Sequence, residues 1–169
     1  MTMLRRGLLD GRGVALAGGV PATIRDAIAR LGARLDTEPI HALVYDARPA
    51  FGGGGKDSLR ECTEQAWIAV HDVATGALIP AGAGKVVLIA PRPDAGPFAA
   101  AARAALENLA RTLSVEWARY GVTAVAIAPG ARTGEDELGE LICFLVSPAG
   151  EYFTGCVFEL GGLEESGSP

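Results

Sequence analysis

One continuous stretch, Phe98–Gly130, limits what this chain can fold into more than any other. It predicts a long helix to Tyr120, a turn at Gly121 and a buried strand, Val122–Ala128, that ends in Pro-Gly. The alanines before Leu106 leave the first helical turns nearly bare, so that a neighbouring helix can pack closely. Apolar side chains recur further along at helical spacing and form one stripe, at Leu106, Leu109, Leu113 and Trp117.

Other apolar runs predict further strands and helices around this stretch. Buried strands are expected at Gly13–Ala17, Ile40–Asp46, Gly84–Ala90 and Cys156–Leu160. Helices are expected from about Pro21 to Gly32, from Asp57 or Ser58 to about Ile79, and over Glu135–Leu145. Ala33–Pro39 is short and polar, and we interpret it as a connector without a strand. Alternating strands and helices predict an α/β domain with a parallel sheet and helices on both faces.

Composition excludes several classes of protein. The 169 residues suit one domain, and a net charge of −5 with dispersed acids argues against nucleic-acid binding. No apolar run reaches the roughly 20 residues of a membrane span, and we find no signal peptide. Three cysteines without metal-ligand spacing fit a reducing cytoplasm, and no metal site is expected. We expect one domain over residues 1–162 and a polar tail over 163–169.

Several motifs resemble the short-chain dehydrogenases/reductases. These are WARYGVTAVAIAPG (117–130), FLVSPAGEYFTGCVFELGG (144–162) and the glycine-containing turn at Gly18-Gly19. The resemblance covers roughly 13–162 and implies a Rossmann-like fold. Measured against that fold, the chain is too short for the second and third strands. We therefore expect a reduced parallel sheet of about five strands, in family order 1-4-5-6-7.

The resemblance also implies where catalytic residues would lie, and each of these positions is altered. The family's asparagine, serine, tyrosine and lysine correspond here to Trp67, Pro91, Ala99 and Arg103. In the family the tyrosine is the general acid/base and the lysine lowers its pKa. Alanine carries no transferable proton, and arginine does not release one near neutral pH. We expect no catalytic residues in this chain.

The glycine loop that cradles a dinucleotide is degenerate as well. Set on the shared isoleucine, the family pattern Thr-Gly-x-x-x-Gly-Ile-Gly retains Gly19, after Gly18, while Thr23 and Arg25 replace the other two glycines. Side chains at these positions fill space that a pyrophosphate needs. Asp36 follows the glycine loop at about the sequence spacing, roughly 20 residues, at which an acid binds the adenine ribose. We nevertheless interpret it as a solvated connector acid. No bound cofactor is expected.

Three functional hypotheses remain open. The first is a non-catalytic subunit, or pseudoenzyme, that assembles with an active family member in a hetero-oligomer, as a heterotetramer, with NAD(P) in the partner. In the family, pairs of active and inactive subunits are known among hydroxyacyl-CoA dehydrogenases, which suggests acyl-CoA, lipid or steroid substrates. The second is a stand-alone ligand-binding or regulatory module. The third is an NAD(P)-dependent oxidoreductase that uses substitutes such as Tyr45, Asp46 or His71.

The family assembles through its two long central helices, and this chain retains both. The expected interface residues are the exposed or stripe-forming side chains of those helices: Trp67, Leu106, Leu109, Leu113, Trp117 and Tyr120. The alternative is that the same stripe packs only on the chain's own sheet.

Overall fold

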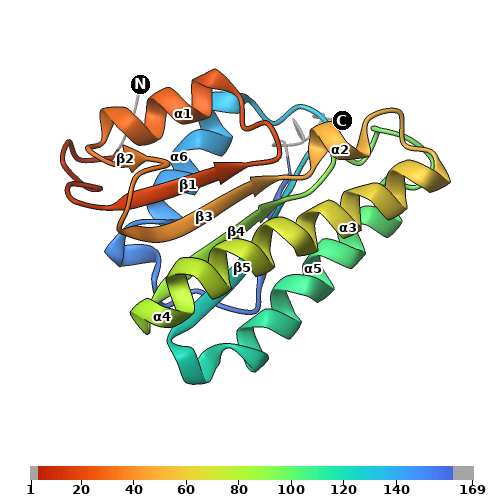
Figure 1. Ribbon diagram of the computed structural model, residues 1–169. Coiled ribbons are helices and arrows are strands. Elements are labelled where there is room, and N and C mark those ends of the chain that lie inside the picture. Colours follow the sequence, from red (N-terminus) through yellow and green to blue (C-terminus); the bar gives the residue numbers. More distant parts are fainter. Residues whose placement is uncertain (1–3, 162–169) are drawn as a thin grey trace, which may run out of the picture.

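The computed structural model, which describes residues 4–161, places a single parallel sheet between two helical layers (Figure 1). The strands lie in the order β2-β1-β3-β4-β5-β6. Their bounds are Gly13–Ala17 for β1, Arg34–Leu35 for β2, Ile40–Asp46 for β3, Gly84–Ile89 for β4, Val122–Pro129 for β5 and Val157–Leu160 for β6. The expected α/β class with a parallel Rossmann-like sheet is confirmed.

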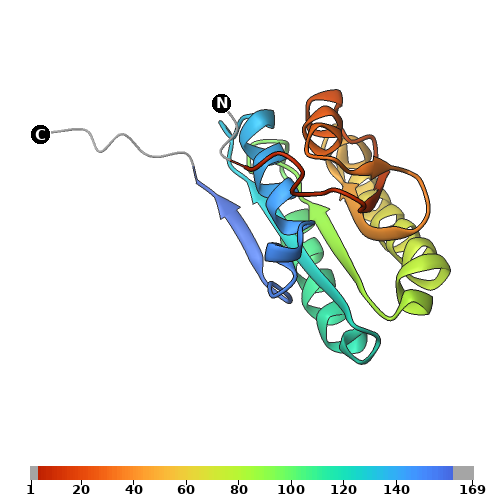
Figure 2. The ribbon, with the colours of Figure 1, turned by 90° about the vertical axis from the view of Figure 1, so that its left-hand side faces the viewer.

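Two helices cover each face of the sheet (Figures 1 and 2). On one face lie α3 (Lys56–Val73) and α5 (Ala99–Glu116), and on the other lie α1 (Ala22–Arg30) and α6 (Glu135–Leu145). Strand alternation divides the core accordingly, since Val86 and Leu88 face α3 and α5 while Val87 and Ile89 face the other layer. Short elements complete the chain: α2 (Arg48–Phe51), a π-helical turn (Ala74–Leu78), α4 (Ile79–Ala81) and 3-10 turns at Ala118–Tyr120 and Pro148–Gly150.

The end of the helix that begins with α3 differs from the prediction. The helical path does not stop before Pro80 but widens into the π turn and continues through α4 to Gly82. Pro80 follows directly after the π turn, as the second residue of α4. Proline alone was therefore a poor marker of this helix end.

The interpretation of Ala33–Pro39 as a strandless connector is wrong. Arg34 and Leu35 form β2, which pairs in parallel with Gly13 and Val14 of β1, so the sheet has six strands instead of about five. Beyond this two-residue pairing, the Asp36 carboxylate lies along the edge of β1 and accepts a hydrogen bond from the Leu16 N–H at 2.8 Å. Asp36 is thus a structural group that covers a sheet edge, and not merely a solvated acid.

The link from β2 to β3 is short enough to press on β1. It passes directly over Gly13, where an added Cβ would collide with the carbonyl oxygens of Pro39 and Thr37. The family fold has a helix and a further strand at this point of the chain. Here four residues, 36–39, make the return, and only a glycine beneath them leaves enough room.

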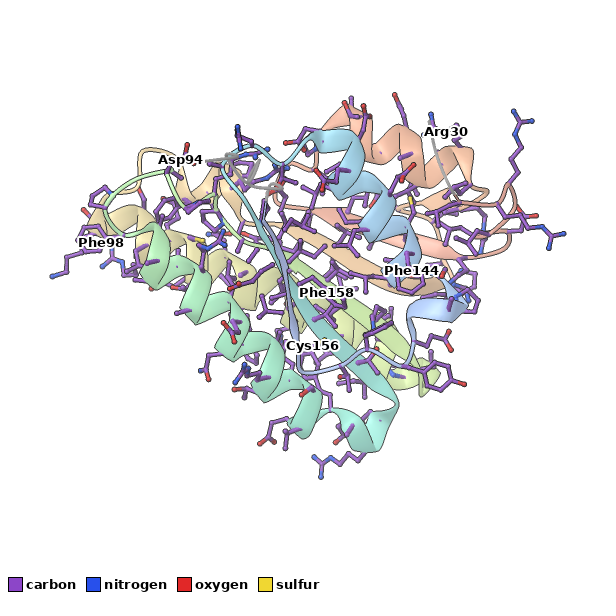
Figure 3. All side chains as sticks on the ribbon, turned by 180° about the vertical axis from the view of Figure 1, so that it is seen from behind. Arg30, Asp94, Phe98, Phe144, Cys156 and Phe158 are labelled. Atoms are coloured by element: carbon purple, nitrogen blue, oxygen red, sulfur yellow. The ribbon has the colours of Figure 1, made fainter. Side chains whose placement is uncertain are left out.

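The last strand is held by aromatic packing and by one buried lysine. The Phe153 ring lies edge-on to Phe144 of α6 and Phe158 of β6, with centroids 5.8 and 5.4 Å away, and Figure 3 shows Phe144 and Phe158 on these two elements. Lys85 of β4 donates from Nζ to the Gly150 carbonyl at 2.7 Å and to that of Phe153. The predicted tail, 163–169, lies outside the described residues. Among residues 4–161, no helix has the length and apolar character that a membrane span requires.

Gly13→Ala tests the tight return over β1. Because the new methyl group meets two backbone carbonyls that cannot rotate away, we expect a loss of at least about 2 kcal/mol in the free energy of unfolding. Urea denaturation followed by circular dichroism measures the change. Gly53→Ala is the matched control, since nothing lies within 4 Å of its added Cβ. Equal stability of the two variants would contradict this description of the link.

Candidate functional site at the carboxyl edge of the sheet

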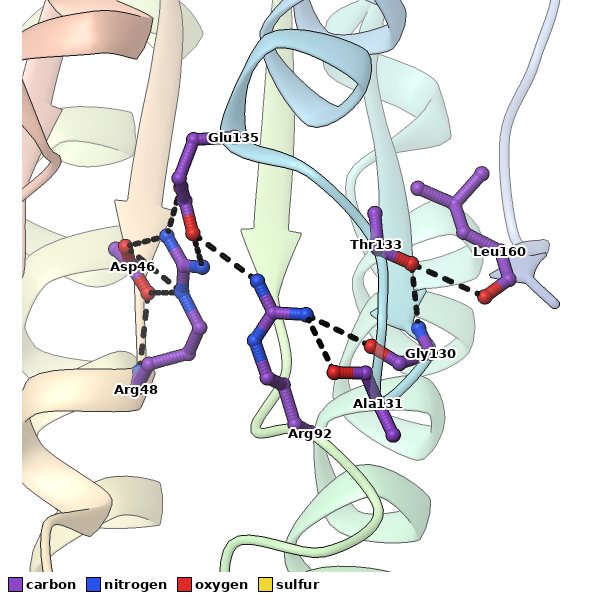
Figure 4. Close-up of polar contacts among 8 residues, drawn as sticks. All are labelled: Asp46, Arg48, Arg92, Gly130, Ala131, Thr133, Glu135 and Leu160. Atoms are coloured by element: carbon purple, nitrogen blue, oxygen red, sulfur yellow. Dashed lines mark hydrogen bonds and ion pairs between the residues drawn. The ribbon is translucent and has the colours of Figure 1, made fainter. Parts of the chain in front are cut away.

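The carboxyl ends of β3, β4 and β5 meet at one edge of the sheet, the edge at which open α/β folds bind their ligands. Here that edge carries four charged side chains, Asp46, Arg48, Arg92 and Glu135, which Figure 4 shows in mutual contact. Asp46 is the last residue of β3, Arg48 opens α2, Arg92 follows β4 and Glu135 opens α6. We call this set the carboxyl-edge network.

Arg48 is the centre of the network. Its Nε lies 2.9 and 3.1 Å from the two Asp46 carboxylate oxygens, and its Nη2 lies 2.7 Å from Oδ2. The other side of the guanidinium donates to Glu135, from Nη1 at 2.6 Å and from Nη2 at 3.0 Å. Such two-sided pairing uses the rigid fork of arginine and fixes α6 against the end of β3.

Arg92 extends the network to the next strand. Its Nη2 donates to Glu135 at 3.1 Å, and its Nη1 donates to the carbonyls of Gly130 and Ala131 at 2.8 and 3.3 Å. Thr133 then accepts from the Gly130 N–H at 2.8 Å and donates to the Leu160 carbonyl at 3.2 Å. The edge from β3 to β6 is therefore spanned by side chains of the chain itself (Figure 4).

The charges within the network stabilise one another. Burial opposes the charge on Arg48, but its hydrogen bonds to Asp46 and Glu135 outweigh this effect and raise its pKa. The hydrogen bond from Arg48, with a further contribution from Arg92, lowers the pKa of Glu135. Within the network, two carboxylates and two guanidinium groups balance in charge.

Three of the four altered catalytic positions lie beside this network. Arg103 of α5 donates from Nη1 to the carbonyls of Pro91 and Pro129, at 2.8 and 2.7 Å. Ala99, at the start of the same helix, is buried. The arginine at the family's lysine position thus ties the ends of β4 and β5 together and has no tyrosine beside it to activate.

Trp67, the fourth altered position, does not lie beside the carboxyl-edge network. It lies on the outer face of α3, 46% exposed, with its ring stacked on Trp117 at 6.4 Å and 5.5 Å from His71. Leu109, Trp117 and Tyr120 are partly buried. Leu106 and Leu113 are buried against the sheet, as the alternative of internal packing expects, and the interface itself stays a prediction. Leu106 and Leu113 of the stripe lie on the side of α5 that packs on the sheet.

The glycine loop is packed against the chain's own backbone. Gly18 and Gly19 both have positive φ, and an added Cβ at Gly18 would strike the Asp46 carbonyl oxygen, while one at Gly19 would lie 3.3 Å from the Pro49 ring. Arg25 faces Asp36 at 3.9 Å, and Thr23 lies in the first turn of α1. The glycines are required by neighbouring segments, and the acid at the ribose position is already bonded.

Two buried groups near this edge, a phenol and a thiol, are poorly suited to proton transfer near neutral pH. Burial raises the pKa of Tyr45 to about 12 and that of Cys62 to about 11. His71 is exposed on α3 and lies 3.4 Å from Asp72. In the described part of the chain, no group of three or more His, Cys, Asp and Glu side chains is placed to hold a metal ion.

The comparisons with known proteins agree with the family resemblance. Galactitol 2-dehydrogenase (L-tagatose-forming) of Cereibacter sphaeroides is 28% identical over 198 residues, which cover 89% of this chain and 76% of that protein. The aligned stretch exceeds the 169 residues of the chain, so the relative contains internal residues that this chain lacks. No protein-family model matches the chain.

Solved structures share the fold. The citronellol catabolism dehydrogenase of Pseudomonas aeruginosa PAO1 superposes with a TM-score of 0.77 at 20% identity, covering 96% of this chain and 98% of that one. A protein of Beutenbergia cavernae, solved with NADP bound at low occupancy, gives a TM-score of 0.72 at 21% identity, with 92% and 97% covered. These structures show that the chain has the architecture of such dehydrogenases.

Sequence reasoning did not identify the carboxyl-edge network. Of its four residues, only Asp46 was singled out from the sequence, as a possible substitute catalytic group. A usable signal exists, because each network residue lies within a few positions of a strand's carboxyl end, and parallel strands bring those ends together. Opposite charges at such positions predict ion pairs across the edge.

Arg48→Met tests the centre of the network. The buried Asp46 carboxylate would lose its partner, so we expect about 3 kcal/mol of destabilisation in urea unfolding at pH 7. Arg60→Met is the control, because Arg60 is exposed on α3 and should change stability by less than about 0.5 kcal/mol. The double variant Asp46→Asn/Arg48→Met should recover part of the loss. A double variant less stable than Arg48→Met would argue against this pairing.

Glu135 makes the same network sensitive to acid. Its pKa is lower in the folded chain than the ordinary 4.5, so its contribution is complete above that value and disappears as pH falls through the folded-state pKa. The stability difference between the natural chain and Glu135→Gln should therefore be large at pH 7 and shrink below about pH 4. Unfolding curves at several pH values measure it. A difference that stayed constant down to pH 3 would show that the ionised carboxylate is not responsible.

Proposed function

We propose that this chain is a non-catalytic, short-chain dehydrogenase/reductase-like subunit that assembles with an active member of that family. The assembly would be a hetero-oligomer, of heterotetramer size, in which the partner holds NAD(P) and performs the oxidation or reduction. Hydroxyacyl- or ketoacyl-CoA, lipid or steroid compounds are the proposed substrates of that partner. The role of this chain is to stabilise the complex and to shape it.

The observation that carries the proposal is the occupied carboxyl edge. Arg48 and Arg92 extend across the region where the fold binds its ligands, and Asp46 and Glu135 neutralise them. Pro91 has no hydroxyl, Ala99 is buried and Arg103 is engaged with two carbonyls. Cofactor binding by this chain would require the network to open and the Arg25–Asp36 pair to separate.

The outer face of α3 and α5 supports the assembly part of the proposal. It exposes Trp67, Ile68 and Val115, at 46%, 49% and 75%. A groove of about 270 Å³ runs between the two helices beside Trp67. Its lining is mainly small or apolar: Thr63, Trp67, Ala105, Leu106, Asn108, Leu109 and Thr112. Exposed aromatic side chains beside a groove are the features that anchor protein interfaces.

Co-expression with full-length family members from the same host tests the proposal. We expect a stable complex by size-exclusion chromatography, with dehydrogenase activity in the partner. Ile68→Glu should weaken the association at least about tenfold, because a buried charge in an interface core is costly. Trp67→Ala should act in the same direction. Tyr152→Glu is the control, since Tyr152 is exposed before β6 and belongs to neither helix.

Two results would overturn the proposal. One is a stable homodimer of the isolated chain that associates with none of these partners. The other is saturable NAD(P)H binding by the isolated chain, measured by the fluorescence of the nicotinamide. The second result would restore the hypothesis of an oxidoreductase with substitute residues.

A further inference from the structure

A polar cavity lies at the amino edge of the sheet, opposite the carboxyl-edge network. It has a volume of about 300 Å³ and is lined by five polar side chains, Arg12, His41, Lys85, Thr123 and Glu151, together with Ala83, Gly84 and Gly121. Four of these residues stand at the starts of β3, β4 and β5, and Arg12 directly precedes β1. None of the five belongs to the carboxyl-edge network or to the helical face proposed for assembly.

Arg12 presents an N–H group without an acceptor. Its Nη1 pairs with Glu151 at 3.1 Å, and its side chain is 16% exposed. Its Nε is buried, and within residues 4–161 no hydrogen-bond partner reaches it. An unbonded N–H on a charged group costs free energy that an acceptor oxygen would recover.

Lys85 brings a buried charge to the same cavity. The residue is 1% exposed, and the carbonyls of Gly150 and Phe153 take two of the three N–H groups of its ammonium. Burial lowers the pKa of Lys85 to about 8, which Cys156 and Glu151 only partly offset. The lysine is thus a cation whose surroundings do not fully compensate it.

His41 supplies a donor of fixed orientation. Its Nδ1 accepts a hydrogen bond from the Gly13 N–H at 2.9 Å, so the neutral ring carries its proton on Nε2. With His41 neutral, the lining contains two cations, Arg12 and Lys85, and one acid, Glu151. The cavity therefore has an excess of positive charge and of N–H donors.

We propose that this amino-edge cavity binds a small oxyanion, which is inorganic phosphate or the carboxylate of a short organic acid. Its oxygens accept from the guanidinium of Arg12 and from His41 Nε2, and its negative charge neutralises the excess. The volume corresponds to about ten water molecules at ~30 Å³ each, so it holds a phosphate or an acid of a few carbons. The site lies at the amino edge of the sheet, opposite the carboxyl-edge network, and is independent of the proposed function.

Calorimetric titration of the full chain at pH 7 tests the site, with sodium phosphate, acetate and succinate as separate probes at one ionic strength set by NaCl. We expect at least one of these anions to bind with a Kd of about 1 mM or tighter and to raise the melting temperature above the NaCl reference. Binding of phosphate without the carboxylates, or the reverse, identifies which source of oxyanion the site accepts.

Variants of single donors locate the binding. His41→Asn keeps an oxygen in place of Nδ1 to accept from Gly13 but removes the Nε2 donor, and Arg12→Gln removes the charge. Each should weaken the anion at least about tenfold, the loss expected for one charge-assisted hydrogen bond. Arg111→Gln, a change to an exposed arginine of α5, is the control and should bind normally. The absence of binding by all three probes, or unchanged affinity in both His41→Asn and Arg12→Gln, would overturn the proposal.

Discussion

The buried carboxylate of Asp46 sets the conditions for the whole carboxyl edge. A carboxylate at 1% exposure has lost most of its contact with water, and Arg48, two residues later, supplies the cation that pairs with it. Once drawn inward, the guanidinium needs a second acceptor on its other side, which Glu135 provides from the start of α6. Arg92 then balances Glu135 and secures the turn after β5. Each charge is placed by the need to satisfy the one before it.

A comparable constraint acts where the chain has lost length. With four residues to return from β2 to β3, the backbone must cross β1 at close range, which requires Gly13 beneath it. The unpaired edge of β1 is then covered by the Asp36 side chain instead of a neighbouring strand. At the position where the resemblance implies a ribose ligand, Asp36 therefore takes the place of missing backbone hydrogen bonds.

The fold could be predicted from sequence because its strands and helices carry strong local patterns, as in Val122–Ala128 and Glu135–Leu145, whose bounds the structure matches within a residue. What failed depended on contacts distant in sequence. Arg34 and Leu35 have no strand-like pattern and pair only because β1 is beside them. Leu106 and Leu113 show helical spacing, but spacing alone does not say whether the apolar side meets the sheet or a partner. Arg48 and Glu135, which pair within the network, lie 87 residues apart in the sequence, and local patterns cannot reveal such a pair.

Arg103 connects these constraints to function. A lysine ammonium is a compact point charge that can lower the pKa of a neighbouring hydroxyl, whereas a guanidinium is a wide, permanently charged fork. Here its Nη1 alone reaches the carbonyls of both Pro91 and Pro129 and holds the ends of β4 and β5 in fixed register. Together with the Arg48 bridge, this ties the ends of β3, β4 and β5 to one another and to the start of α6. In the proposed subunit these two arginines contribute a stable surface, whereas a catalytic edge must admit substrate and release product.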